Sequence, residues 1–192
     1  YDIYAVRSAG IDPATGQEIF ITKDGHYTLK YNEDDKVAVG NENPILKGSW
    51  GMTLAYKGFG LNLTSSYTFG ADIYNWTIAD AVENIDPYFN VDVRAFTDRW
   101  KQPGDHTRFL GLGEKKETYR SERFVEKKNE FYLSNITFTY ELPKSFLKKI
   151  KLERLVVGIA YDDVFRISSV KMERGTSYPY QRSLNLIFRP TF

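Results

Sequence analysis

The sequence Phe59-Gly60-Leu61-Asn62-Leu63-Thr64-Ser65-Ser66-Tyr67-Thr68-Phe69 alternates almost perfectly between two kinds of residue. Its odd positions are aromatic or aliphatic except for Ser65, and its even positions are glycine, asparagine, serine or threonine. This period of two predicts a β-strand with one apolar face and one small, polar face. Aromatic residues stand at both ends of the apolar face with leucines between them, which suits two membrane interfaces around a lipid band. A half-buried strand of a soluble domain is the alternative for this segment alone.

Four further segments show a similar alternation over a similar length: residues 47–56, 131–141, 152–162 and 182–192. A strand of about 11 residues, tilted near 45°, spans roughly 25 Å, which is the height of a barrel's apolar band. Strands of soluble proteins are usually shorter, about 5–6 residues. The predicted fold class is therefore all-β: about six C-terminal strands of a large transmembrane antiparallel β-barrel, with a short strand at residues 1–8 completing the six.

The predicted strands are joined by alternating short and long connections. Lys57-Gly58 and residues 143–150 are compact links. The long links, which we expect to be extracellular loops, are residues 9–46, 70–130 and 163–178. Such alternation is typical of periplasmic turns and extracellular loops, so Phe192 would end the last strand on the periplasmic side.

Local structure is expected inside the first two long loops. Turn-forming residues at 12–16 and 23–25 flank a predicted hairpin of Glu18–Ile21 against Tyr27–Tyr31. Residues 76–86 have helical character and end before a proline, which predicts a short helix. Loops of this length are uncommon and usually functional.

The composition excludes several classes of function. The 26 basic and 25 acidic residues leave a net charge of +1, too small an excess for binding a nucleic-acid backbone. The absence of cysteine excludes disulfides, thiolate nucleophiles and zinc–thiolate sites. His26 and His106 have no partner at metal-ligand spacing. We therefore expect no metal, no cofactor and no nucleic-acid partner.

No catalytic residues are predicted. The sequence has no phosphate-binding or nucleophile motif, and its carboxylate pairs, Asp34-Asp35 and Asp162-Asp163, are neighbours in sequence. Neighbouring residues of a strand point to opposite faces, so these carboxylates suit a solvated rim better than the acid pair of a glycosidase. We predict that the chain is not an enzyme.

Two groups of residues are candidates for binding or assembly. Trp76, Asp98, Arg99 and Trp100 lie in the longest predicted loop, where an aromatic face can stack on a sugar ring or anchor a partner protein. Packing within the loop is the alternative for both tryptophans. Alternating apolar residues at the C-terminus are expected to act as a barrel-assembly signal: Leu184, Leu186, Phe188 and Phe192.

A series of short motifs, in order along almost the whole chain, resembles the C-terminal part of the SusC/RagA-type TonB-linked outer-membrane transporters. The motifs are residues 10–18, 56–59, 69–70, 73–75, 98–101, 103–105, 121–125, 140–143, 173–176, 178–179 and the terminal Phe192. Each motif alone is weak, but together they are quite specific. Two departures bear on the substrate rather than the fold. Asp163-Val164-Phe165 stands where many members have Asn-Leu-Phe, and residues 108–118 match no pattern of the family.

The resemblance implies a barrel of about 22 strands with a plugged lumen, of which this chain would supply the last six or so. It implies import of oligosaccharides or peptides across the outer membrane of a Gram-negative bacterium, beneath a SusD-like surface lipoprotein. The family's plug domain and TonB-contacting box lie near its N-terminus and are absent from these residues. The expected partners are therefore the remainder of the barrel, the plug, TonB, the lipoprotein and membrane lipid.

Elementary energetics also predict that these strands belong to a larger barrel. An open sheet has two edges whose unpaired N–H and C=O groups cost several kcal/mol each in hydrocarbon. The first residue, Tyr1, is not methionine, which predicts a mature or truncated chain.

Two other hypotheses stay open at the level of sequence. One is a soluble β-sandwich that binds carbohydrate through loop aromatics, and the other is a glycoside-acting β enzyme without an identified acid pair. A sandwich requires the apolar faces of residues 59–69 and 184–192 to pack in a dry protein interior. A membrane barrel requires the same faces to point outward.

Overall fold

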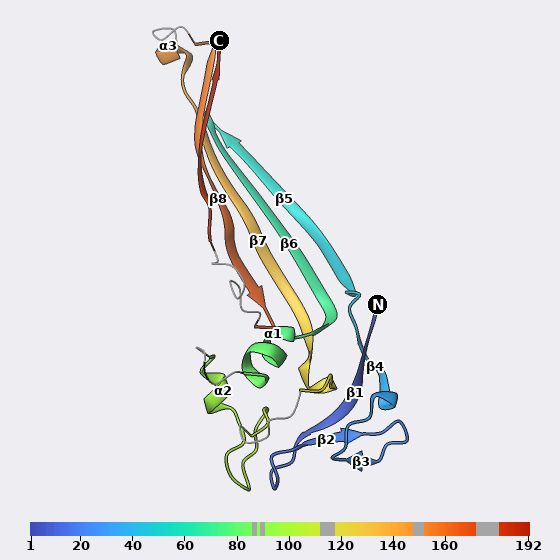
Figure 1. Ribbon diagram of the computed structural model, residues 1–192. Helices are drawn as coiled ribbons and strands as arrows, with labels where there is room; N and C mark the ends of the chain where they lie inside the picture. Colours follow the sequence, from blue (N-terminus) through green and yellow to red (C-terminus); the bar gives the residue numbers. More distant parts are fainter. Residues whose placement is uncertain (86–87, 89–90, 112–117, 148–151, 172–180) are drawn as a thin grey trace. The chain divides into compact units, whose positions relative to one another are not determined.

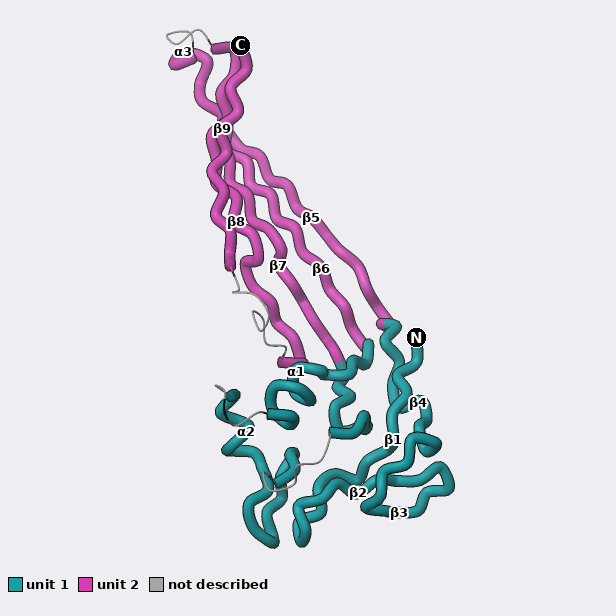
Figure 2. The backbone as a smooth tube through the Cα atoms, in the orientation of Figure 1, with its two compact units in different colours: residues 1–43, 71–127 teal, residues 44–70, 128–192 magenta. Residues whose placement is uncertain are grey.

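The computed structural model describes residues 1–85, 88, 91–111, 118–147, 152–171 and 181–192. They form two compact units, drawn in different colours in Figure 2. Unit 1 contains residues 1–43 and 71–127, and unit 2 contains residues 44–70 and 128–192. The sequence motifs at 173–176 and 178–179 lie outside the described residues.

Unit 2 is built on one sheet of long strands (Figure 1). The strands of this sheet are β5 Leu46–Tyr56, β6 Phe59–Tyr74, β7 Val125–Glu141, β8 Arg154–Ser168 and β9 Leu184–Thr191. Residues 71–74 of β6 and 125–127 of β7 belong to unit 1. Within the described residues the order of the strands is β5-β6-β7-β8-β9, so neighbours in sequence are neighbours in space. The pairs β5–β6, β7–β8 and β8–β9 are antiparallel, and in the part of the chain that the structure describes the sheet is open, because β5 and β9 each have a strand on one side only. This confirms the predicted all-β, antiparallel fold class.

The tight turn expected at Lys57-Gly58 is confirmed. Tyr56 pairs with Phe59, and the two residues between them have φ angles of 48° and 86°. Two central residues with positive φ form a hairpin turn whose twist matches that of the flanking strands. Glycine is needed at the second position also for space, since a Cβ on Gly58 would lie 3.0 Å from the carbonyl oxygen of Glu141.

Three strands continue beyond the alternating segments that predict them. β6 continues past Phe69, β7 begins before Phe131, and β8 continues past Asp162. Backbone pairing needs no particular order of side chains, so the hydrogen-bond ladder extends past the apolar band. The sequence pattern therefore marks the height of the apolar band and not the ends of the strands.

Unit 1 contains a second, smaller sheet of order β3-β2-β1-β4 in the described residues. Its strands are β1 Asp2–Ile11, β2 Glu18–Ile21, β3 Tyr27–Thr28 and β4 Lys36–Asn41. The pairing of β2 with β3 confirms the predicted hairpin, although β3 is shorter than expected. β4 lies in a segment that the sequence predicts as loop.

The N-terminal strand differs from the sequence prediction. Residues 1–8 are expected to complete the large sheet, but β1 pairs with β2 and β4 instead. Ile3, Ala5 and Val6 of this strand are buried in unit 1, at 2% exposure or less. Its apolar residues therefore meet a protein core, which a period of two does not distinguish from a lipid face.

The core of unit 1 includes residues of a short helical segment. Asn75 caps α1 Trp76–Ile78 by accepting a hydrogen bond from the Ile78 backbone N–H at 3.2 Å, and a π-helical turn follows at Ala79–Glu83. This segment is shorter than the helix predicted over 76–86, whose last residue is outside the described residues. The buried cluster consists of Ile3, Tyr74, Ile78, Ala79, Val82, Ala95, Phe109 and Phe124.

The other described helices are short: α2 Arg94–Thr97 in unit 1, α3 Lys144–Leu147 in the compact link after β7, and the 3-10 helices Glu33–Asp35 and Glu122–Phe124 in unit 1. No helix among the described residues is both long enough and apolar enough to cross a membrane.

Candidate functional site

One face of the unit 2 sheet is apolar from strand to strand. Leu54 of β5 is paired with Leu61 of β6, and the ring of Phe59 lies 5.8 Å from that of Phe138 in β7. Directly paired side chains share a face, so the apolar positions of the five strands form one surface. We call this surface the apolar wall, with these members: Trp50, Met52, Leu54, Tyr56, Phe59, Leu61, Leu63, Tyr67, Phe69, Ile136, Phe138, Tyr140, Leu155, Val157, Ile159, Tyr161, Leu184, Leu186 and Phe188.

The apolar wall is exposed or partly exposed within unit 2, except for Leu155, which is 6% exposed. Leu54 is 52% exposed, Ile159 47% and Leu186 81%. Soluble monomers rarely expose contiguous apolar patches of more than a few hundred Å², so a wall of this extent needs an apolar neighbour. Tyr56 and Phe59 lie at one end of the β5–β6 pair and aliphatic residues occupy its middle, as the sequence pattern predicts.

The opposite face of the sheet carries small and polar side chains. Thr53 donates a hydrogen bond to Asn62 at 2.7 Å, which joins β5 to β6. Asp162 accepts hydrogen bonds from Asn135 at 2.7 Å and from Ser183 at 2.8 Å, which join β8 to β7 and to the start of β9. One apolar face and one hydrogen-bonded polar face are the lipid and lumen sides expected of a barrel strand.

A β-bulge in β8 ends the apolar wall. Asp163 and Val164 oppose a single residue of β7, and Asp163 has a φ of 53°, which aspartate tolerates better than most residues. The extra residue exchanges the two faces of β8. Beyond the bulge, Phe165 lies on the polar face with its ring 6.0 Å from that of Phe131, and Arg166 lies on the side of the apolar wall.

Three of the four C-terminal assembly candidates, Leu184, Leu186 and Phe188, belong to this wall, and Phe192 follows the end of β9. The pairing of β9 with β8 places Leu184 opposite Tyr161 and Leu186 opposite Ile159. Phe188 is 68% exposed and Phe192 is 85% exposed. Within the described residues β9 has no neighbour on its outer edge, so these side chains line the edge that another strand would meet.

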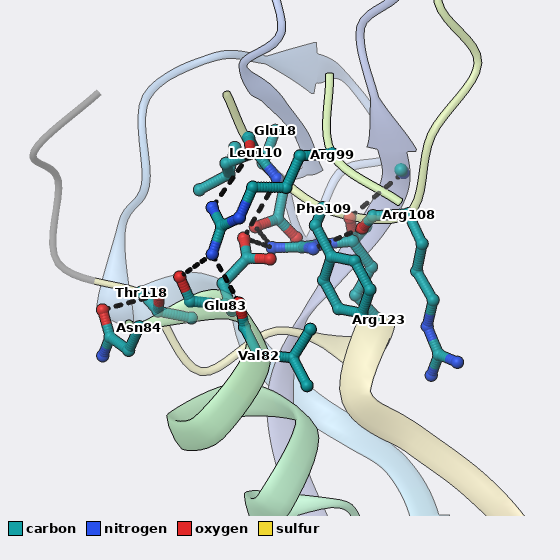
Figure 3. Close-up of polar contacts among 12 residues, drawn as sticks. Glu18, Val82, Glu83, Asn84, Arg99, Arg108, Phe109, Leu110, Thr118 and Arg123 are labelled. Atoms are coloured by element: carbon teal, nitrogen blue, oxygen red, sulfur yellow. Dashed lines mark hydrogen bonds and ion pairs between the residues drawn. The ribbon is translucent and has the colours of Figure 1, made fainter. Parts of the chain in front are cut away.

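The loop candidate Arg99 is buried in unit 1. It is 4% exposed, and its guanidinium donates to the carbonyl oxygens of Leu110, Val82 and Glu83 (Figure 3). Burial lowers the pKa of Arg99, and the Glu83 carboxylate opposes this shift. The carbonyls come from two separate segments, so Arg99 holds the loop together, and its charge is directed into the protein.

A second arginine, Arg123, lies at the centre of the same cluster (Figure 3). Its guanidinium is 2.9 Å from the carboxylate of Glu18 and 2.9 Å from that of Glu83, and the three side chains are 7%, 4% and 1% exposed. Burial by itself would lower the pKa of Arg123, but the two carboxylates outweigh it and raise that pKa. The three residues connect β2, the π-helical turn and the segment before β7, and we call them the Arg123 triad.

Trp100 is packed against backbone of its own unit. Its indole Nε1 donates to the carbonyl oxygen of Pro13 at 2.9 Å. A Cβ on Gly16 would lie 2.5 Å from the indole and one on Gly111 would lie 3.1 Å from it. The ring therefore covers the turn at residues 12–16, which joins two motifs that are far apart in sequence. This placement favours the loop-packing alternative for Trp100.

Asp98 and Trp76 are the loop candidates that stay exposed. The Asp98 carboxylate accepts a hydrogen bond from the Thr97 hydroxyl at 2.6 Å. Trp76 is 55% exposed, and its ring lies 4.5 Å from that of Tyr74. Burial raises the pKa of Tyr74 to about 12, so this phenol stays neutral. Among the four loop candidates, Trp76 presents the largest apolar surface to solvent.

The ion pairs of the Arg123 triad could not be predicted from the sequence. The partners of Arg123 lie 105 and 40 residues away, and isolated charged residues are most often on the surface. The only signal is that the motif at 121–125 contains Arg123. Among the described residues, no group of histidines and carboxylates is arranged to hold a metal ion.

No protein-family model and no curated protein matches the chain. Among solved structures, the RagAB peptide importer in the "open-open" state matches with a TM-score of 0.77 and 18% identity, over 100% of this chain and 22% of that one. The structure of the RagAB peptide transporter matches with a TM-score of 0.69 and 18% identity, over 88% of this chain and 19% of that one. The "closed-closed" state of the importer matches with a TM-score of 0.61 and 16% identity, over 88% and 20%.

This chain therefore spans about a fifth of the length of the chains that it matches, 19% to 22%. At a sequence identity of 18% or less, the similarity to these chains shows a shared fold only. It confirms at that level the SusC/RagA-type resemblance of the sequence: the chain has the fold of one part of a RagAB importer chain.

Proposed function

We propose that the chain is a barrel segment of an outer-membrane, TonB-dependent nutrient importer that takes up peptides or oligosaccharides. The observation that carries the proposal is the apolar wall: five adjacent strands expose apolar side chains on one face and carry hydrogen-bonded polar side chains on the other. Lipid is the neighbour that covers such a face without a second protein layer. The fold of the RagAB importer chains supports the same conclusion.

The open edges of the sheet support a larger assembly. β5 and β9 have one hydrogen-bonded neighbour each among the described residues, and unpaired backbone groups cost several kcal/mol each in hydrocarbon. Further barrel strands of the same protein would pair with these edges. Energy coupling would act through a plug and a TonB-contacting segment outside these residues, and a SusD-like lipoprotein would cover the barrel from outside.

Matched arginine substitutions on the two faces test the proposal. Leu61→Arg places a charge on the apolar wall, whereas Asn62→Arg places it on the polar face one residue further. In a membrane barrel the first change places a charge in lipid, which costs up to about 2–4 kcal/mol at the bilayer midplane and less toward the interfaces, and the second faces water. We expect Leu61→Arg to lower the amount of folded protein in the outer membrane severalfold and Asn62→Arg to leave it nearly unchanged, as measured by membrane fractionation and heat-modifiable electrophoresis. A complete protein that is folded and monomeric in buffer without detergent would refute the proposal and favour the soluble β-sandwich.

A further inference from the structure

A cation lies over two aromatic rings on the surface of unit 1. The guanidinium carbon of Arg120 is 5.3 Å from the ring centroid of Tyr74 and 5.5 Å from that of Trp76. The two rings are themselves 4.5 Å apart at an interplanar angle of 53°. We call Tyr74, Trp76 and Arg120 the Arg120 platform.

The platform is held by the core of the unit. The Arg120 carbonyl accepts a hydrogen bond from the Val6 N–H at 3.3 Å, and Tyr74 is 7% exposed. The preceding residue, Tyr119, stacks on Tyr31 with ring centroids 4.1 Å apart and an angle of 6°. The backbone on both sides of Arg120 and the ring of Tyr74 are thus held in place, which lowers the entropy cost of binding.

Arg120 differs from the other arginines of this region. Arg123 is buried between two carboxylates, and Arg99 is buried among carbonyl groups. Arg120 is exposed, and among the described residues its guanidinium has no hydrogen bond or ion pair. The neighbouring cation, Lys36, is paired with Glu33. Within the described residues no carboxylate is paired with Arg120, although those of Glu18 and Asp80 are near enough to act on the pKa of Tyr74.

The geometry defines the ligand chemistry that would fit. A guanidinium lying over a ring face keeps its N–H groups in its own plane, where they can bind both oxygens of a carboxylate. Trp76 is 55% exposed and Tyr119 is 38% exposed, so apolar surface flanks the cation. The alternative is that Arg120 packs on the rings only for stability, with water binding its N–H groups. Such an arginine would not discriminate between ligands, so the selectivity for a carboxylate is the property to measure.

We propose that the Arg120 platform binds the carboxylate of a ligand whose adjoining apolar surface stacks on Trp76. The carboxylate can come from the C-terminus or an acidic side chain of a peptide, or from a uronic acid unit of an oligosaccharide. The proposal deepens the proposed function and rests on it in one respect: the ligand would be the imported nutrient.

Binding of matched charged and neutral ligands to the complete protein in detergent tests the site. One pair of probes is a short peptide with a free C-terminal carboxylate and the same peptide as its amide. The second pair is an oligogalacturonate and its methyl ester. Calorimetry gives the ratio of affinities within each pair. For hydrogen bonds to a charged group we expect the wild-type protein to prefer the carboxylate by about tenfold or more in at least one pair.

Four variants separate the site from general effects of charge and folding. Arg120→Gln should abolish the preference, and Arg120→Lys should retain part of it, because lysine keeps the charge without the planar fork. Trp76→Ala should weaken the charged and neutral ligands alike. Lys101→Gln, which removes another exposed cation of unit 1, should change nothing.

The outcomes are decisive in both directions. A preference in the peptide pair or in the sugar pair that disappears in Arg120→Gln supports the site and identifies the source of the carboxylate. A wild-type protein without preference in either pair, or a preference that survives in Arg120→Gln, overturns it. Outer-membrane assembly of the same variants is measured separately, so a failure of the site and a failure of the importer proposal are distinguishable.

Discussion

At the scale of single residues, charged side chains of unit 1 have two roles: some form buried ion pairs, and others stabilise turns at the surface. Those of the Arg123 triad are buried and paired, and they determine how the loop segments meet. Asp12, by contrast, is a partly exposed carboxylate that organises a turn, accepting hydrogen bonds from Thr15 Oγ1 at 2.6 Å and from the Ala14 N–H at 3.1 Å. The triad and the turn give separate predictions because one depends on burial and the other on hydrogen bonding at the surface.

Arg123→Met should destabilise unit 1 strongly. The substitution leaves Glu18 and Glu83 buried without their cation, and removal of one partner of a buried pair costs about 3–5 kcal/mol. Hydrogen exchange of the backbone amides in β2 should accelerate by about a hundredfold or more. Lys36→Met, which breaks the exposed pair with Glu33, is the control and should cost less than about 1 kcal/mol. Equal effects of the two substitutions would show that the triad adds no stability beyond that of a surface pair.

The turn at Asp12 should become less stable in acid. Hydrogen bonds from Thr15 and from the Ala14 backbone hold the pKa of Asp12 below its usual 3.8. A lowered pKa in the folded state means that the carboxylate contributes stability above pH 3.8, and that this contribution is lost as the pH falls through the folded pKa. Thr15→Val removes the largest cause, so the transition should move to higher pH.

Trp100 reports this transition, because its indole is bound to the Pro13 carbonyl of the same turn. The measurement is the acid titration of its fluorescence, with Trp50 and Trp76 replaced by phenylalanine. An unchanged midpoint in Thr15→Val would contradict the role of the Thr15 hydroxyl.

At the scale of elements, the sequence predicts strands better than it predicts their partners. The alternation of residues 59–69 is enough to predict β6 and its apolar face, and a lysine–glycine pair is enough to predict the turn before it. The same kind of alternation in β1 misleads, because its buried side chains face a protein core and its pairing depends on residues 36–41. Pairing between distant segments leaves no mark in a local pattern.

The candidate residues follow the same division. Leu184, Leu186 and Phe188 could be placed on one face from their spacing, and the structure places them there. The buried state of Arg99 and the contact of Trp100 with Gly16 could not be predicted, since both depend on chain segments distant in sequence.

Deletion of Phe192 tests the assembly role of the last strand. Phe192 continues the alternation of β9 and is 85% exposed, which suits recognition by the machinery that inserts barrels or by a neighbouring strand. We expect deletion to lower the outer-membrane level of the complete protein severalfold. Thr191→Ser changes the preceding side chain on the other face and should leave that level unchanged. Unchanged assembly after the deletion would show that Phe192 carries no such signal.

At the scale of the whole molecule, the two units differ in where their apolar side chains lie. Unit 1 has a protein core that includes Ile3, Val82 and Phe124, all at 2% exposure or less. Unit 2 has no comparable core cluster in its described residues, and most of its large apolar side chains lie on the apolar wall. Such a sheet is not expected to be stable alone in water, because neither the wall nor its two open edges are covered. We therefore propose that lipid covers the apolar wall in the complete protein.

Lipid contact at two adjacent residues of β5 tests this claim most directly. These residues contain no cysteine, and after removal of any cysteine elsewhere in the complete protein, single ones are introduced by Leu54→Cys on the apolar wall and Ala55→Cys on the polar face. Each is labelled with a fluorophore in the complete protein, which is then placed in bilayers of brominated lipid. We expect strong quenching at position 54 and little at position 55, because adjacent side chains of a strand point to opposite faces. Equal quenching at both positions, or quenching at position 55 alone, would contradict a lipid-facing wall.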